Sequence, residues 1–237
     1  MIPGVRLAVW SGPRSISTAM MRSWGNRPDT KVVDEPLYAH FLSFTGIDHP
    51  GREEVLAAGN TSWQFVVSEL TAPTQGIYYQ KHMTHHLTPD IPRGWIKDLT
   101  NILLIRDPAE VVSSYVRSRP RVSDDDIGLV QQLELHELLG SDAPVIDSAD
   151  FLQDPELYLR FMCVHIGVDF TDRMLHWAAG TRDTDGIWGK YWYGAVVAST
   201  GFEPYVKRRA ELKGATKELV DRSRPVYDRL YSARVVL

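Results

Sequence analysis

Residues 5–21 read VRLAVWSGPRSISTAMM: an apolar run, then a turn of small and hydroxyl-bearing residues around one arginine, then the start of a helical pattern. Backbone N–H groups at a helix start have no partner inside the helix, and the helix dipole adds partial positive charge there. Hydroxyls and a guanidinium complete a site for an anion. The stretch therefore predicts a phosphate-binding loop between a strand and a helix. Its residues are Gly12, Pro13, Arg14, Ser15, Ile16, Ser17 and Thr18.

A second stretch, NILLIRDPAEVVSSYVRSR at residues 101–119, has the same organisation. It predicts a buried strand that ends at Arg106 and a helix that opens at Pro108, since proline is tolerated in the first helical turn. Ser114 follows Arg106 by eight residues, inside that helix. Arg106 and Ser114 are candidates for a second phosphate, and two phosphate sites suggest a nucleotide with phosphates at two positions.

Strand and helix patterns alternate along the chain, which predicts an α/β fold with a parallel sheet flanked by helices on both faces. We expect strands at residues 5–10, 31–34, 76–82, 101–106 and 144–146. We expect residues 37–60 to be irregular or weakly helical, and residues 168–237 to be loop up to a final helix at 215–230. No repeat or linker divides the chain, so residues 1–237 are expected to form a single domain.

Ligands of such sheets bind beyond the carboxyl ends of the strands. The residues that directly follow predicted strands are therefore expected to meet in one crevice. They are Arg14, Glu35, Lys81, His82 and Arg106.

The overall composition excludes several classes of protein. With a net charge of −4 and a pI near 6.1, the chain has no basic field for nucleic acid. No apolar run approaches the ~20 residues that a membrane span needs, and the N-terminus lacks the pattern of a signal peptide. The single cysteine, Cys163, fits a reducing compartment. These features predict a cytoplasmic protein without a membrane or nucleic-acid partner, and they indicate no oligomeric state.

The first loop differs from the loop of nucleoside triphosphatases and kinases, Gly-x-x-x-x-Gly-Lys-Ser/Thr, because it lacks the second glycine and the lysine. Transfer of a γ-phosphate by that machinery is disfavoured. A capped helix start without a ligand is the alternative interpretation. The second arginine–serine segment, at the matching place in the sheet, favours binding.

The two segments resemble the nucleotide-binding motifs of the sulfotransferases that use 3′-phosphoadenosine 5′-phosphosulfate (PAPS). Residues 13–18, PRSIST, are similar to the 5′-phosphosulfate loop, and Arg106 with Ser114 is similar to the 3′-phosphate motif. The stretch 147–170 is similar to a strand–helix segment of the same family. More closely, the chain resembles a bacterial branch of the family in four features: the GPRS start at 12–15, Asp-Glu-Pro at 34–36, Lys81 with His85 and His86, and STGF at 199–202. One position departs: Ile16 stands where the family has glycine, and a side chain there narrows the approach to the phosphate.

The resemblance implies the P-loop fold of sulfotransferases and transfer of a sulfuryl group from PAPS to a hydroxyl or amine of a small molecule. The second product is adenosine 3′,5′-bisphosphate, and no metal ion is expected. Arg14 would stabilise the leaving 5′-phosphate, with Ser15, Ser17 and Thr18 holding its oxygens. Arg106 and Ser114 would bind the 3′-phosphate. A late loop covers the nucleotide in this family, and Lys190 or Arg208 is the residue expected to contact it here.

Two residues compete for the role of general base. Glu35 matches a glutamate position of some sulfotransferases, and His82 matches the catalytic histidine of the cytosolic branch. Histidine has the better unperturbed pKa, whereas a glutamate needs its pKa raised by burial. We favour Glu35, assisted by Lys81. Two other functions stay open: a divergent nucleotide or small-molecule kinase on the P-loop fold, and a non-catalytic nucleotide-binding protein.

Overall fold

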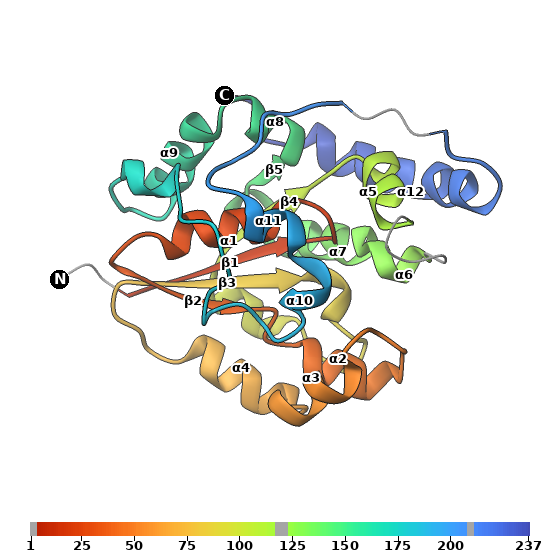
Figure 1. Ribbon diagram of the computed structural model, residues 1–237, viewed down its shortest axis with the longest axis horizontal. Helices are drawn as coiled ribbons and strands as arrows, with labels where there is room; N and C mark the ends of the chain where they lie inside the picture. The colour runs from red at the N-terminus through yellow and green to blue at the C-terminus, as the bar shows by residue number, and fades with distance from the viewer. Residues whose placement is uncertain (1–3, 117–122, 208–210) are drawn as a thin grey trace.

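The computed structural model describes residues 4–116, 123–207 and 211–237. Its centre is one sheet of five strands in the order β2-β3-β1-β4-β5, and every neighbouring pair is parallel (Figure 1). The strands are β1 Val5–Ser11, β2 Thr30–Asp34, β3 Ile77–Met83, β4 Thr100–Ile105 and β5 Val145–Asp147. The predicted α/β fold with a parallel sheet is confirmed.

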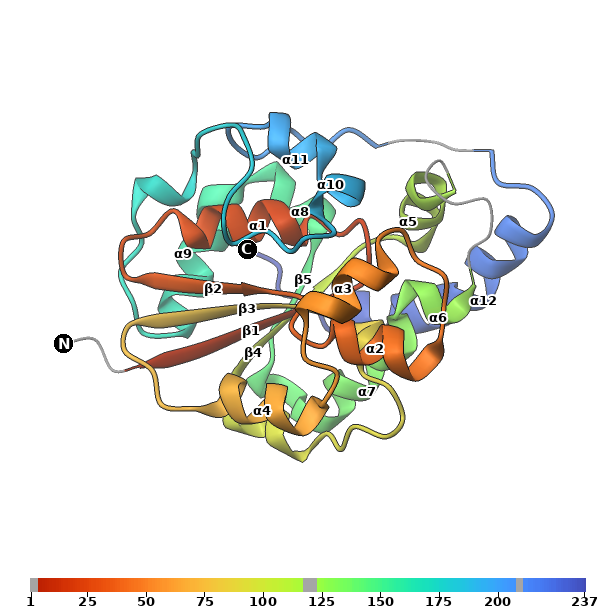
Figure 2. The ribbon, with the colours of Figure 1, turned by 60° about the horizontal axis from the view of Figure 1, so that its bottom comes forward.

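Helices cover both faces of the sheet, because the strands are apolar on both sides (Figure 2). In β1, Leu7 and Val9 pack with α1, α8 and α9, whereas Ala8 and Trp10 pack with α4, α5, α7 and α12. The helices are α1 Ser17–Gly25, α2 Tyr38–Thr45, α3 Arg52–Ala58, α4 Trp63–Thr71, α5 Pro108–Tyr115, α6 Asp124–Ile127, α7 Leu129–Leu139, α8 Ser148–Gln153, α9 Pro155–His165, α10 Gly189–Trp192, α11 Gly194–Ala198 and α12 Ala215–Ser232.

Residues 37–60, expected to be irregular or weakly helical, contain the two short helices α2 and α3, so the helical alternative holds. Helix α2 buries Tyr38, Ala39, Phe41 and Leu42 in a small apolar cluster that Val55 of α3 completes. Tertiary packing, rather than a strong helical pattern, stabilises these short helices. Two further short helices, α10 and α11, interrupt the predicted late loop.

The parallel order determines where a site can form. The carboxyl ends of β1, β2, β3 and β4 lie at one edge of the sheet, and the chain leaves each of them toward the same side (Figure 2). The segment that carries α10 and α11 lies over that side (Figure 1). In the described ranges, the helices are all too short or too polar to cross a membrane.

Candidate active site

A cavity of about 720 Å³ lies at the carboxyl edge of the sheet. The first predicted phosphate loop contributes residues 13–19 to its wall, and the second segment contributes Arg106 and Ser114. Glu35 and Lys81 also line it, as does the late segment from Trp192 to Val206. Five segments that are far apart in the sequence therefore meet around one space.

The two predicted phosphate-binding segments contact each other directly. The Nε of Arg14 donates a hydrogen bond to Ser114 Oγ at 2.9 Å, and Arg106 Nη1 donates to the carbonyl oxygen of Arg14 at 2.9 Å. Arg106 also forms an ion pair with Glu110, one helical turn away. No described side chain caps the start of α1. Its first N–H groups, two arginines and several hydroxyls thus surround one end of the cavity, a set suited to phosphate.

Gly12 and Ile16 take different places in the loop. A Cβ on Gly12 would lie 2.4 Å from the carbonyl oxygen of Ile127, so this position excludes a side chain, and Gly12 lies behind the cavity wall. Ile16 has φ 55°, the left-handed backbone that glycine adopts most easily. Its side chain packs partly against the apolar cluster beneath α1. The isoleucine therefore follows the backbone path that a glycine would take.

Left-handed backbone is concentrated at this cavity. Among the described residues other than glycine, φ is positive at Arg14, Ile16 and Glu35, with values of 61°, 55° and 42°. All three line the cavity. Such residues cost on the order of 1–3 kcal/mol each and persist where the surrounding structure holds them. This concentration of strain is typical of a functional site.

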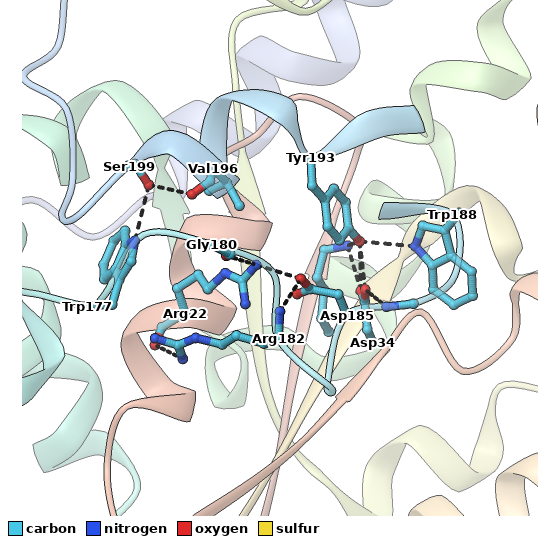
Figure 3. A network of polar contacts seen from close by, with 12 residues as sticks. Arg22, Asp34, Trp177, Gly180, Arg182, Asp185, Trp188, Tyr193, Val196 and Ser199 are labelled. Atoms are coloured by element: carbon cyan, nitrogen blue, oxygen red, sulfur yellow. Dashed lines mark hydrogen bonds and ion pairs between the residues drawn. The ribbon is translucent and has the colours of Figure 1, made fainter. Parts of the chain in front are cut away.

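Glu35 and Lys81 form the centre of a buried polar network. Lys81 Nζ lies 2.5 Å from Glu35 Oε1 and 2.9 Å from Asp34 Oδ1. It also donates to the hydroxyl of Tyr193 at 2.8 Å, and that hydroxyl in turn donates to Asp34 Oδ2 at 2.7 Å. Trp188 Nε1 donates to the same hydroxyl at 3.0 Å (Figure 3). Each charged group of the network therefore has an opposite charge or a hydrogen bond.

The environment of the network sets its protonation. Burial raises the pKa of Glu35 above 4.5; the ammonium of Lys81 opposes this shift and the negative charge of Asp34 adds to it. Burial by itself would lower the pKa of Lys81, but the two carboxylates raise it above 10.5. Lys81 therefore stays charged, and Glu35 is a better proton acceptor than an exposed glutamate.

His82 is not brought to the cavity. Successive residues of a strand point to opposite faces, so His82 points away from the side of Lys81. Its ring stacks on Trp10 at 4.0 Å, and its Nε2 lies 3.1 Å from Gln80 Oε1. Burial, followed by the nearby charge of Lys81, lowers the pKa of His82 to about 3. The geometry places Glu35 rather than His82 beside the phosphate loop.

Lys190 is also outside the cavity wall: it forms an exposed ion pair with Glu54 at 2.5 Å. Arg208, the alternative to Lys190, lies outside the described residues. The neighbours of Lys190 on the same segment, Trp192 and Tyr193, line the cavity instead. The sequence signal for Tyr193 is the aromatic run WGKYWY at 188–193, which marks the segment but not the residue that faces inward.

A second group of buried contacts fixes the segment that carries Tyr193. Arg22 of α1 is 1% exposed, and its Nη2 lies 2.6 Å from Asp185 Oδ2 (Figure 3). The carboxylate of Asp185 also accepts from the backbone N–H of Arg182. Gly186, the residue after Asp185, donates its backbone N–H to Asp34. Asp34 therefore binds both Lys81 and the late segment, so the position of Tyr193 is set from two sides.

Comparison with known proteins agrees with this geometry. A family model described as a sulfotransferase domain matches residues 5–233. The chain is 35% identical over 228 residues to branched-chain-amino-acid aminotransferase-like protein 1 of Arabidopsis thaliana, covering 94% of this chain and 41% of that protein. It is 32% identical to the second such protein of the same plant, covering 92% and 40%. The chain thus spans about two fifths of the length of these relatives.

Solved structures share the fold. The sulfotransferase domain from the curacin biosynthetic pathway matches with a TM-score of 0.57 and 16% identity, over 93% of this chain and 97% of that one. A sulfotransferase from Alicyclobacillus acidocaldarius matches with a TM-score of 0.56 and 14% identity, over 98% and 97%. The chain belongs to the sulfotransferase domain family.

The network predicts a specific loss of stability for Tyr193→Phe. This change removes the donor to buried Asp34 and leaves the ring in place, so the free energy of unfolding should fall by about 1–3 kcal/mol. The matched control is Tyr191→Phe, because Tyr191 is 43% exposed and its hydroxyl bonds the exposed Glu54. That change should cost less than about 0.5 kcal/mol in denaturant titrations. Equal losses in the two variants would contradict the network.

Proposed function

We propose that this protein transfers a sulfuryl group from PAPS to a hydroxyl or amine of a small molecule. One observation carries the proposal: the two segments predicted for the 5′- and 3′-phosphates meet at one cavity, joined by the Arg14–Ser114 and Arg106–Arg14 hydrogen bonds. Membership of the sulfotransferase domain family supports the reaction class. The proposal includes a single domain over residues 1–237, a cytoplasmic location and no part for a metal ion or nucleic acid.

Different residues of this chain would bind different parts of the donor. The N–H groups at the start of α1, with Ser15, Ser17 and Thr18, would bind the 5′-phosphate. Arg14 would lie beside its bridging oxygen, where negative charge develops as the S–O bond breaks. Arg106 and Ser114 would bind the 3′-phosphate, a group that PAPS carries and ATP lacks.

Glu35 would act as the general base. The acceptor oxygen or nitrogen forms a bond to sulfur while its proton passes to Glu35, and adenosine 3′,5′-bisphosphate leaves with the electron pair of the broken S–O bond. By analogy with phosphoryl transfer, positioning and positive charge supply most of the rate enhancement. Lys81 and Tyr193 hold the carboxylate of Glu35 in place, through contacts of 2.5 and 3.2 Å to its Oε1.

Calorimetric titration tests the donor. The purified protein should bind adenosine 3′,5′-bisphosphate tightly and respond little to ATP with magnesium, because the loop lacks the lysine that contacts the β- and γ-phosphates of ATP. Binding of ATP alone would favour a kinase. Binding of neither nucleotide would contradict a nucleotide-dependent function.

The 3′-phosphate assignment predicts a selective defect in Arg106→Ala. Loss of a charge-assisted contact to the 3′-phosphate should weaken binding of adenosine 3′,5′-bisphosphate roughly ten- to hundredfold. Binding of AMP should weaken much less, because AMP loses only the support that Arg106 gives to the carbonyl oxygen of Arg14. The matched control is Arg160→Ala, which also breaks an ion pair with a glutamate four residues away, but on the surface of α9. Equal losses for the two nucleotides would remove the assignment.

The base assignment predicts that Glu35→Gln lowers kcat about a hundredfold or more with nucleotide affinity preserved. The rate of the unmodified protein should rise with pH as Glu35 loses its proton, with a midpoint above 4.5 because the pKa of Glu35 is raised. The variant should lack this limb of the pH profile. Glu54→Gln, outside the cavity, is the control. Unchanged turnover in Glu35→Gln would exclude Glu35 as the base.

A further inference from the structure

The cavity has two halves that follow the order of the strands. The donor segments follow β1 and β4, whereas Glu35 follows β2 and Lys81 lies near the carboxyl end of β3, on the other side of β1. The chain continues from these two strands into Tyr38 at the start of α2 and into His85 and His86. With the donor segments on one side, the space above β2 and β3 is left for the acceptor.

Aromatic rings form the wall of this acceptor half. Tyr38 and His86 are 3% and 2% exposed, and their rings stack at 4.8 Å with planes 5° apart. The hydroxyl of Tyr38 lies 2.9 Å from His49 Nδ1, and His49 meets the ring of Trp192 edge-on at 6.3 Å. Burial lowers the pKa of His86 well below 6.5, so this ring is uncharged at neutral pH. Flat rings of this kind suit a flat, apolar partner.

The charges around the cavity oppose an anionic acceptor. Of the described charged residues that line it, three are cations and three are carboxylates: Arg14, Lys81, Arg106, Glu35, Glu110 and Glu203. Both arginines lie among the donor segments. In the acceptor half Lys81 is held between Glu35 and the buried Asp34, which leaves these three groups with an excess of negative charge. Bound phosphates would add more.

We propose that the acceptor half selects an aromatic alcohol that carries no acidic group. The inference rests on the proposed sulfuryl transfer. The partly exposed ring of Trp192 would pack on the flat part of the acceptor, with the mutually stacked Tyr38 and His86 in the wall beside it, and the acceptor's hydroxyl would lie at Glu35 beside the donor. An acidic substituent would enter a region where carboxylates outnumber ammonium groups, and Lys81, the lysine that lines this half among the described residues, is already paired with Asp34 and Glu35.

Three probes of equal shape and different charge test the selection. They are tyramine, tyrosol and 4-hydroxyphenylacetate, which are cationic, neutral and anionic. Binding is measured by calorimetry on protein saturated with adenosine 3′,5′-bisphosphate, and transfer is measured as kcat/KM with PAPS. We expect tyrosol and tyramine to bind at least about tenfold more tightly than the anion. Binding of 4-hydroxyphenylacetate as tight as that of tyrosol would overturn the proposal, as would equal binding of a cyclohexanol of the same size.

Two neighbouring residues of α10 locate the binding surface. Trp192 lines the cavity, whereas Tyr191 contacts Glu54 outside it. Trp192→Ala should weaken tyrosol binding about fivefold or more by loss of the ring contact, with affinity for adenosine 3′,5′-bisphosphate unchanged. Tyr191→Ala should leave both affinities unchanged. An unaltered affinity for tyrosol in Trp192→Ala would contradict the assigned surface.

The two proposals fail in different ways. If adenosine 3′,5′-bisphosphate binds but the aromatic probes neither bind nor accept the sulfuryl group, the acceptor class is wrong and the donor site stands. If the bisphosphate does not bind, the proposed function is wrong, and titration of the probes into the nucleotide-free protein still decides whether the ring-lined half selects by charge. Glu35→Gln provides a separate test. Because it removes one carboxylate, it should reduce the ratio of the tyrosol affinity to the 4-hydroxyphenylacetate affinity.

Discussion

The buried ammonium of Lys81, held between Asp34 and Glu35, is the interaction on which the rest of the site depends. Removing one partner of a buried ion pair typically costs about 3–5 kcal/mol, because it leaves an uncompensated charge. Here the three groups come from the ends of two neighbouring strands, and Tyr193 joins them from 112 residues away. The same contacts that balance the charge of Lys81 therefore fix the direction of Glu35 and the path of the late segment. Stability and the geometry of the proposed base are two consequences of one arrangement.

The strained backbone of the site is likewise held by contacts from other segments. Arg14, Ile16 and Glu35 hold left-handed conformations that ordinary side chains disfavour, and all three face the cavity. Arg14 is held by a hydrogen bond from Arg106 to its carbonyl oxygen, and Glu35 by its backbone bond to Lys81. Ile16 is held by apolar packing under α1. Contacts from other segments thus keep each strained residue in place, which is the condition under which such backbone persists.

The sequence predicted the strands and the convergence of Arg14, Glu35 and Arg106 at one cavity, because apolar runs and strand ends are local patterns. It did not separate Lys81 from His82. Both residues lie near the end of β3 and point to opposite faces of the sheet. The contact of His82 with Trp10 and that of Lys81 with Asp34 show that Lys81 is the one that faces the cavity. The sequence also could not show that Lys190 points away from the cavity and Tyr193 into it. Their directions depend on Glu54, which pairs with Lys190, and on Asp34, which accepts from Tyr193; both lie far away in the sequence. The roles assigned to these residues stay predictions.

One late segment completes both halves of the cavity. Near its start Tyr193 contacts Lys81 and Glu35; near its end the hydroxyl of Tyr205 donates to Glu110 at 2.6 Å, and Glu110 pairs with Arg106. The two predicted phosphate-binding motifs, residues 13–18 and Arg106 with Ser114, therefore form only part of the cavity wall, and the late segment completes it. Since Asp34 and Arg22 anchor this segment through buried contacts, the distance between the proposed base and the proposed 3′-phosphate site is set by packed structure on both sides. A sulfuryl transfer that relies on positioning needs such a fixed distance, because the donor and the acceptor must meet in line.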